Sequence, residues 1–423
     1  MTAYTFTLTI NGKTLPMEQF RVTGGVFGSV GHLTATSSLS ALAALKIDVY
    51  TMAAEATAPL ETYLTVQKET GKPVRLFGGE FMNATWDYDN DKIEIHARDW
   101  AGQLVDQKRV LTSISKQIIK LLAPLAPGQN PNSQGVSNIN QSLTQIVTAI
   151  AQEVSMTPVL NLTGGVPGNT QIGALYGSGD HALIQVQQNL WQILNHIARD
   201  TGYEVYVTPN KQLVFGQGGV GIDPIKLTWK VGTVPQGSYA CKSLHIQHHP
   251  RRNATFRVLV FSYDPGKGQQ TTGHATVVGS NLGGSAGLKP GIWLGADALA
   301  ADKKLASVQK GGVTVSQVPL YSFRFDGLTQ DQATQKAQTI AIDISKRELI
   351  MNCVIAGLPE ITPTGKINIS GAVDPNFASN DFYVNGFEHQ FSMGSSGFVT
   401  HIKALDIPTL GTGGQGNEGG PTL

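Results

Sequence analysis

NLWQILNHIARDTGYEVYVTPNKQLVFG, residues 189–216, is the stretch from which we interpret the rest of the chain. Asn189 is a favourable helix N-cap, and Gln192 stands where a capping-box partner reaches back to the N-cap backbone. Gly202 follows the last apolar turn, where a left-handed residue ends a helix at low steric cost. A short helix is therefore predicted, with one apolar face formed by Leu190, Ile193, Leu194 and Ile197.

The second half of the stretch predicts two strands. Tyr203, Val205 and Val207 occupy alternate positions, which places them on one face of a strand. Thr-Pro-Asn-Lys at 208–211 supplies turn residues, and an apolar run returns at 213–215. The unit is expected to be helix, strand, turn and strand.

The composition narrows the class of protein. Lys+Arg number 31 against 30 Asp+Glu, a net charge of +1, which argues against the basic footprint of a nucleic-acid-binding protein. Charged residues are 14% of the chain, below the roughly 25% usual for a soluble domain. Such a surface suits burial between subunits, although a β-rich protein with long polar loops has the same composition.

Cysteines and apolar runs set further limits. Cys241 and Cys353 are interpreted as reduced, buried thiols, with a disulfide as the alternative, and two thiolates are too few for a Cys-ligated zinc or iron–sulfur site. The N-terminus lacks the basic and apolar regions of a signal peptide, and no apolar run reaches ~18 residues. We expect a chain made in a cytoplasm and not inserted into a membrane.

Residues 1–107 are predicted to form a first small β-barrel. Short alternating segments rich in β-branched and aromatic residues follow one another, with Asn-Gly at 11–12 and a polar turn at 87–91. Asp99 and Trp100 could be a catalytic or sugar-binding pair, but a tryptophan that caps the barrel end is favoured.

Residues 108–200 are predicted to be a helical or α+β insertion. A helical segment at 114–122 leads into a Pro/Gly/Asn-rich connector, and Ser142 with Gln145 caps another helix. SLTQIVTAIAQ at 142–152 aligns without gaps on NLWQILNHIAR at 189–199, which indicates either a duplication or convergence of two amphipathic helices. The first copy also faintly resembles cell-wall-binding LysM modules.

Residues 201–328 are predicted to be a β-rich middle region with a long Gly-rich loop. His-Ile-Gln-His-His-Pro-Arg-Arg at 245–252 is interpreted as a solvated strand end, because adjacent histidines on a strand point to opposite faces and suit one metal poorly. Arg251 and Arg252 could instead face a DNA-conducting lumen. From about 266 to 317 we expect an extended loop or arm.

Residues 329–408 are predicted to be a helix followed by a second β-barrel, and 409–423 a flexible tail. Thr329 and Gln332 form a third capping box. Strand-like segments separated by Pro/Gly turns then continue to about 408. The helix is expected to lie against a barrel.

No known catalytic motif is present in the sequence: there is no HExxH, Walker loop, GxSxG, CxxC or EF-hand loop. The acids most plausible for glycan cleavage stand in no glycosidase motif; they are Glu80, Glu94, Glu153, Asp200 and Glu204. We assign no catalytic, cofactor-binding or metal-binding residue and expect a protein that is not an enzyme.

Three motifs in this order resemble one known family. They are W-x-x-L-x-x-I-A-x-x-x-G-Y-E-V at 191–205, IEIHARDWAGQLVDQ at 93–107, and IAGLPEITPTGKINISG with FYVNGFEHQFSMGSSGFVTHIKAL over 355–405. Together they are similar to baseplate hub proteins of contractile phage tails, the late-control-D-like group, and to the hub part of type VI secretion spike proteins. The resemblance spans about 1–108 and 186–408.

The resemblance implies a mainly β fold with α/β insertions, in which two small β-barrel domains of hub type flank a helix-containing middle region. It also implies a structural role in the virion tail baseplate. There a trimeric, pseudo-sixfold ring joins the hexameric tail tube to the trimeric central spike and leaves a channel for tape measure protein and DNA during genome ejection. Expected partners are the homotrimer, tail tube protein, central spike protein, other baseplate proteins and tape measure protein, with no cofactor and no specific nucleic acid. The alternative is a cell-wall-binding or muralytic tail protein.

Overall fold

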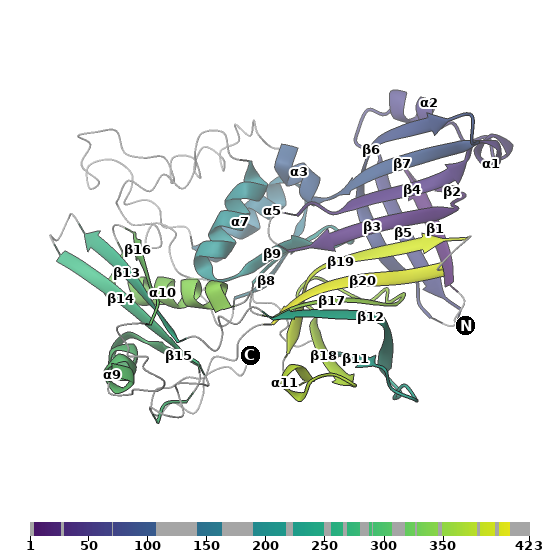
Figure 1. The fold of residues 1–423 in the computed structure, drawn as a ribbon. Coiled ribbons are helices and arrows are strands. Elements are labelled where there is room, and N and C mark those ends of the chain that lie inside the picture. Colours follow the sequence, from purple (N-terminus) through teal and green to yellow (C-terminus); the bar gives the residue numbers. More distant parts are fainter. Residues whose placement is uncertain are drawn as a thin grey trace, which may run out of the picture.

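The computed structural model describes most of residues 4–406. Within that range the undescribed residues are 27–28, 70, 107–141, 163–188, 217–222, 249–254, 265–268, 280–286, 290, 307–317, 326–327, 346–348, 379–380 and 394–396. The fold is mainly β, with two barrels side by side, an α/β unit at their junction and a small sheet at the far end (Figure 1). The helix expected at 114–122, the connector after it and the tail at 409–423 lie outside the described residues.

The first barrel is built from the N-terminal strands. In sheet order they are β3 (Gln19–Gly25), β4 (His32–Ser38), β7 (Lys92–Asp99), β6 (Val74–Asp87), β5 (Glu61–Lys68), β1 (Tyr4–Ile10) and β2 (Lys13–Leu15). Alternate residues point inward, as in Leu8, Ile10, Ile93 and Ile95, which are fully buried. Two short helices, α1 (Leu39–Ala44) and α2 (Val49–Ala54), are capped by Ser38 and Asp48.

The second barrel is a closed ring of six strands. Its order is β18 (Lys366–Gly371), β11 (Ile225–Trp229), β12 (Ser238–His248), β17 (Leu349–Ala356), β20 (Gly397–Asp406) and β19 (Phe382–Ser392), and β19 pairs back to β18. A short helix, α11 (Pro375–Ala378), precedes β19. The barrel interior is filled by aliphatic residues and Phe382.

The second barrel draws two of its strands from a part of the chain that the sequence placed elsewhere. Residues 225–248 were expected in the middle region, yet β11 and β12 pair with β18 and β17 across more than a hundred intervening positions. Alternation in a sequence identifies a strand but not its partner, because pairing is set by the tertiary fold.

The α/β unit contains residues 189–216, for which the sequence predicted a helix followed by two strands. It comprises α3 (Ala101–Asp106), α5 (Leu143–Glu153), β8 (Thr157–Asn161), α7 (Leu190–Thr201), β9 (Glu204–Val207) and β10 (Gln212–Gly216). The predicted caps are confirmed: Asn189 and Gln192 form a reciprocal capping box, and Gly202 ends α7 with φ 76°. Ser142 and Gln145 form the equivalent box on α5. Ile193, Leu194 and Ile197 point inward, as predicted, and Trp191 is 3% exposed.

The small sheet was not foreseen. Its order is β15 (Gly291–Leu294), β14 (Gln269–Val278), β13 (Phe256–Asp264) and β16 (Leu320–Arg324), covered by α9 (Gly295–Ala306) and α10 (Gln330–Ser345). The expectation of an extended loop over about 266–317 was therefore wrong for the described residues. The face that α9 buries is formed by Ala298, Ala301 and Leu305, and a face so rich in alanine has little hydropathic contrast.

Helix α10 has its predicted cap but a different neighbour. Thr329 and Gln332 exchange hydrogen bonds as a capping box. The expectation that this helix lies against a barrel was wrong, because its alanine face packs on β13 and β14. Gly273 explains the close approach: a Cβ there would lie 2.0 Å from the carbonyl oxygen of Ala333.

Candidate functional site: the joined barrels

The two barrels share one strand order. Lettered a to f along the chain, the first barrel uses β1, β3, β4, β5, β6 and β7, and the second uses β11, β12, β17, β18, β19 and β20. In both, hydrogen-bonded neighbours run b, c, f, e, d, a, and the pairings b–c, c–f, f–e and e–d are antiparallel in both. The same strand order thus occurs twice in one chain, with the direction of strand a as the difference.

The barrels differ at strand a. In the second barrel β11 is parallel to both of its neighbours, β12 and β18, and so closes the ring. In the first barrel β1 is antiparallel to β5 and pairs on its other side with the short β2. The first barrel is therefore left open between strands a and b, and this opening is where the second barrel joins it.

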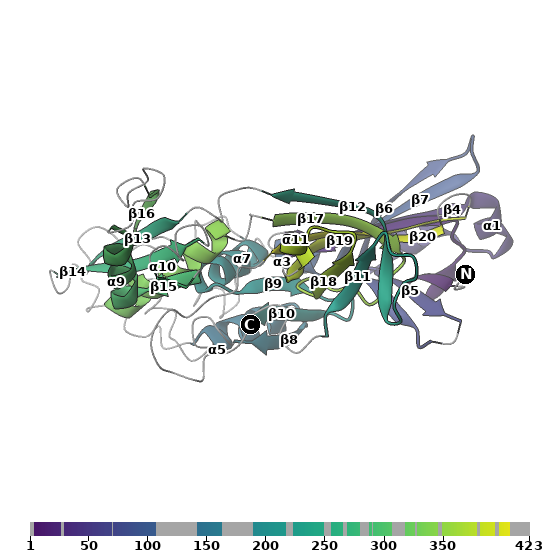
Figure 2. The ribbon, with the colours of Figure 1, turned by 60° about the horizontal axis from the view of Figure 1, so that its bottom comes forward.

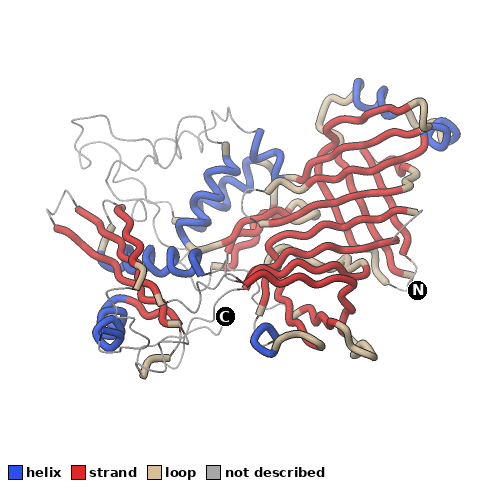
Figure 3. The backbone as a smooth tube through the Cα atoms, viewed as in Figure 1, coloured by secondary structure: helices blue, strands red, loops and turns tan. Residues whose placement is uncertain are grey.

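Strand β19 belongs to both barrels. Its start, Phe382 and Tyr383, pairs with β18 of the second barrel. The register of β19 with β20 then shifts between Val384 and Gly386, and from Gly386 to Ser392 the strand pairs with β3 of the first barrel. A β-bulge bends and twists a strand, so this one redirects β19 from one barrel to the next. The strands of both barrels form one continuous surface (Figure 3).

The tip of the β19–β20 hairpin fills the opening of the first barrel. Phe398 packs against Tyr4 and Phe6, with 5.2 Å between ring centroids in each pair, and Phe391 lies 4.4 Å from Phe6. Phe398 belongs to the core of the first barrel and Phe391 packs against that core, although both come from the last two strands that the structure describes. Burial of such aromatic side chains stabilises the junction between the two barrels.

Polar groups at the seam are paired. Arg21 on β3 donates to Glu388 on β19 at 2.7 Å. His389 is 1% exposed, and its Nδ1 lies 3.0 Å from Oγ1 of Thr400, which also accepts from the backbone N–H of Leu358. Burial lowers the pKa of His389 to about 3, so this histidine is neutral in the folded protein at neutral pH.

A second contact joins the first barrel to the α/β unit. Trp100 is 1% exposed at the barrel end, where its Nε1 donates to the carbonyl oxygen of Pro209 at 3.3 Å and the ammonium of Lys211 lies 4.6 Å from its ring. Asp99 accepts from the backbone N–H groups of Gly31 and Ala101. Burial raises the pKa of Asp99 to about 7 against the opposing effect of those donors.

The acids singled out from the sequence lie in different units. Glu80 is buried in the first barrel, where its Oε2 forms an ion pair with Nη2 of Arg98 at 3.3 Å. Its other carboxylate oxygen accepts a hydrogen bond from Gln103, so this carboxylate has a structural role. Glu94 is exposed on β7, whereas Glu153 lies on α5 and Glu204 on β9. The side chain of Asp200 lies outside the described residues.

The histidine and cysteine candidates form no metal centre among the described residues. His245 and His248 lie on the exposed β12, whereas 249–252, including Arg251 and Arg252, lie outside the described range. Cys241 and Cys353 are both free thiols inside the second barrel, close enough to hydrogen-bond. The neighbouring thiol and burial raise the pKa of Cys353.

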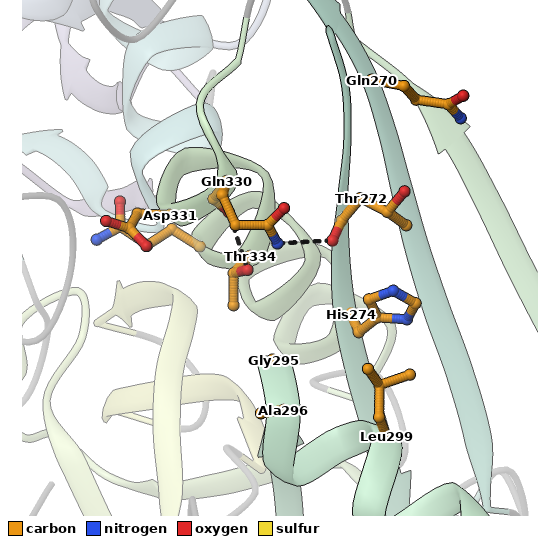
Figure 4. A pocket seen from close by; sticks show the side chains of 10 residues that line it. Gln270, Thr272, His274, Gly295, Ala296, Leu299, Gln330, Asp331 and Thr334 are labelled. Atoms are coloured by element: carbon orange, nitrogen blue, oxygen red, sulfur yellow. Dashed lines mark hydrogen bonds between the residues drawn. The ribbon is translucent and has the colours of Figure 1, made fainter.

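One open pocket lies on the small sheet, where β14 meets the first turns of α9 and α10 (Figure 4). Its volume is about 800 Å³. Gln330 closes one side by donating from Nε2 to the carbonyl oxygen of Thr272 at 2.8 Å. His274 also lines it, and burial lowers its pKa. Sequence analysis missed this pocket because most of it is formed by the region expected to be a loop.

No protein-family model matches the sequence, and no curated protein matches it. Among solved structures, a tail protein from Neisseria meningitidis MC58 matches with a TM-score of 0.57 at 12% identity, over 95% of this chain and 96% of that chain. The 43 kDa tail protein of prophage MuSo2 from Shewanella oneidensis matches with a TM-score of 0.51 at 14% identity, over 96% of this chain and 99% of that chain.

A type VI secretion system component from Escherichia coli matches with a TM-score of 0.45 at 12% identity, over 95% of this chain and 77% of that chain. The first two matches cover the whole architecture and show that this chain has the fold of phage tail proteins. The resemblance stated from the sequence motifs is thereby confirmed at the level of fold. Among the described residues, no helix is both long and apolar enough to cross a membrane.

Proposed function

We propose that this protein is the structural hub of a contractile-tail baseplate. Three copies would form a ring of six barrels that joins the sixfold tail tube to the threefold central spike. The observation that carries the proposal is the strand order b, c, f, e, d, a repeated in both barrels. A threefold ring presents a near-sixfold surface only if each subunit supplies two equivalent modules.

Two further features support a structural role. The barrels are held together by one continuous sheet and a shared aromatic core, so the spacing of the two modules is fixed within a subunit. The low charge of the chain suits surfaces that become buried against other subunits. We propose that the α/β unit and the small sheet lie outside the ring, since they extend away from the barrel pair (Figure 2).

In this role the partners are a second and third copy of the chain, the tail tube protein, the central spike protein, other baseplate proteins and tape measure protein. The protein acts in the virion tail, where the ring encloses the path of tape measure protein and DNA, and it needs neither a cofactor nor catalysis. For the domains, we propose a first barrel at 1–107. We further propose a second barrel that combines 225–248 with 349–406, because those strands close one ring.

Native mass and electron microscopy test the proposal. Light scattering of the protein, alone and with tube or spike protein, should give about 135 kDa for the hub, three times the 45.0 kDa chain. Averaged images of that species should show six lobes with threefold differences. A monomer under every condition would exclude the ring. A zymogram on peptidoglycan distinguishes the structural hub from the alternative, a muralytic protein. Clearing by the purified wild type would contradict a purely structural hub.

A further inference from the structure

The seam between the barrels uses one strand e and one strand b, and each barrel has both. Inside the chain, strand e of the second barrel (β19) pairs with strand b of the first (β3). Strand e of the first barrel (β6) and strand b of the second (β12) have no corresponding partner among the described strands. A head-to-tail ring of copies would bring these two edges together between subunits.

Strand β6 repeats the construction of β19. Its first half pairs with β5 as far as Glu80, just as the start of β19 pairs with β18. A bulge follows at Met82, matching the one at Asn385 of β19. Residues 83–87 then pair with β7 alone among the described strands (Figure 2, where the β6–β7 hairpin projects from its barrel). The arm that β19 uses at the seam is therefore present on β6 with its outer edge open.

Strand β12 repeats the construction of β3. On one side β12 pairs with β17 over 243–248, as β3 pairs with β4. On the other side β11 covers only 238–240, so the backbone of 243–247 has no strand beside it among the described residues. An open strand edge is a template for pairing with another chain.

The internal seam also supplies the register for this pairing. Aligning β6 with β19 at their bulges makes Thr85 equivalent to Glu388 and Trp86 equivalent to His389. The paired residues can then be traced in each barrel from strand e across strands f and c to strand b. This makes Gln247 of the second barrel equivalent to Thr23 of the first, and Ile246 equivalent to Val22. Because Glu388 faces Thr23 and His389 faces Val22, the pairs expected between subunits are Thr85 with Gln247 and Trp86 with Ile246.

We propose that neighbouring copies of this chain join by antiparallel pairing of the β6 arm (83–87) of one subunit with the β12 edge (243–247) of the next. The inference rests on the proposed ring and names its subunit interface. At the internal seam His389 and Val22 are fully buried, whereas their equivalents Trp86 and Ile246 are only partly covered in a single chain. Pairing would complete their burial.

The arm also carries apolar surface that a neighbour would cover. Tyr50 of α2 lies edge-on to Trp86, with 6.4 Å between ring centroids, and is itself 69% exposed. Tyr88, directly after the arm, is 80% exposed, and Met82 at the bulge is 49% exposed. Several large exposed apolar side chains gathered at one hairpin are typical of an interaction site.

Cysteine cross-linking tests the register. A chain carrying Thr85→Cys and one carrying Gln247→Cys, with different tags, are produced together in cells that make the whole tail. A short bis-maleimide is then added to purified hub complexes. Directly opposite residues have Cβ atoms ~4.5–5.5 Å apart, so a cross-linked heterodimer is expected. Thr85→Cys with Lys242→Cys is the out-of-register control, and wild type reports any reaction of Cys241 and Cys353.

A chain with both Thr85→Cys and Gln247→Cys should give covalent dimers and trimers and nothing larger, because the ring closes at three subunits. Thr23→Cys with Glu388→Cys, opposite one another at the internal seam, is the positive control and should cross-link within one chain. A complex of three-fold mass without the Thr85–Gln247 product would overturn this interface and leave the proposed hub intact. A monomeric mass throughout would overturn both.

An edge variant gives independent evidence. A chain carrying both Thr85→Lys and Gln247→Lys should lose most of the three-fold mass while keeping its melting temperature, since both side chains are exposed in a single chain and two like charges would lie directly opposite one another in the pair. Leu320→Lys, on the small sheet at a residue that is 48% exposed, is the matched control and should assemble normally. Normal assembly of a folded chain with both lysines would contradict the proposed pairing.

Discussion

Phe398 of β20 lies against the ring of Tyr4 of β1, near the start of the chain, with 5.2 Å between centroids and 74° between ring planes. The hydroxyl of Tyr4 donates to the carbonyl oxygen of Gly357, directly beneath Phe398. The N-terminal barrel is thus completed by the C-terminal hairpin. The core of the first barrel therefore includes a side chain of the C-terminal hairpin, whereas the core of the second barrel is formed by its own residues alone.

Removal of the Phe398 ring should destabilise the barrel pair. Phe398→Ala is expected to lower the free energy of unfolding by about 3–5 kcal/mol, because it empties a site packed by four other aromatic rings. Urea denaturation measures the change. Tyr263→Ala, at a residue that is 45% exposed, is the control and should stay within about 0.5 kcal/mol of wild type.

Gly357→Ala tests the same contact from the other side. A Cβ at this position would lie 1.7 Å from the Phe398 ring, so the substitution should destabilise the fold by more than about 2 kcal/mol. Adding Phe398→Leu should restore part of the loss, because a smaller side chain makes room. Additive losses in the double variant would show that the two positions are not coupled as the contact requires.

The helix α7 gives a prediction that began with the sequence. Ile197 is 0% exposed, and Ile197→Ala should cost about 2–5 kcal/mol in the free energy of unfolding. Arg199→Ala, two positions along on the exposed side of the same helix, separates core packing from helix propensity and should change little. A negligible cost at Ile197 would mean that the core of the α/β unit does not depend on this face.

Helix caps and individual strands could be predicted from the sequence, whereas the pairing between distant strands could not. Asn189, Gln192 and Gly202 act within one helix, so their roles followed from spacing alone and are confirmed. The same reasoning could not assign β12 to the second barrel, because its partner β17 lies about a hundred residues further along the chain. Helix α9 was not predicted because its alanine-rich buried face differs little in hydropathy from its exposed face. The high helix propensity of alanine was the signal that could have identified it.

The candidate site was the least predictable part. The motif containing Phe398 and His389 could be placed in a barrel by resemblance, but its insertion into the other barrel depends on a bulge at Asn385 that has no distinctive residue type. Likewise, the common strand order emerges only when the ladders are traced. Trp86 and His389 occupy equivalent positions in the two barrels, but they are different residue types, so the sequence alone does not reveal the equivalence.

His389 should make the protein sensitive to acid. Its pKa falls from 6.5 in the unfolded chain to about 3 when folded, so the unfolded state binds the proton more tightly. Stability from this group is complete above pH 6.5 and is lost as the pH falls toward 3, by about 2–3 kcal/mol between pH 6.5 and 4.5. Urea titrations at both pH values should show a smaller acid loss in His389→Gln than in wild type. An identical loss in both would exclude this histidine as the cause.

Asp99 should act in the opposite direction over a similar range. Burial raises its pKa from 3.8 to about 7, so the folded state binds the proton more tightly. Its contribution is complete below pH 3.8 and is lost as the pH rises to about 7, which partly cancels the effect of His389. Asp99→Asn removes this titration and should leave a steeper loss of stability between pH 6.5 and 4.5 than wild type shows. The difference between the stability–pH profiles of Asp99→Asn and wild type gives the contribution of Asp99. Asp87→Asn, at a fully exposed carboxylate, is the control. If Asp99→Asn and wild type showed parallel profiles, the carboxyl group would have to titrate alike in both states, contrary to its burial between Gly31 and Ala101.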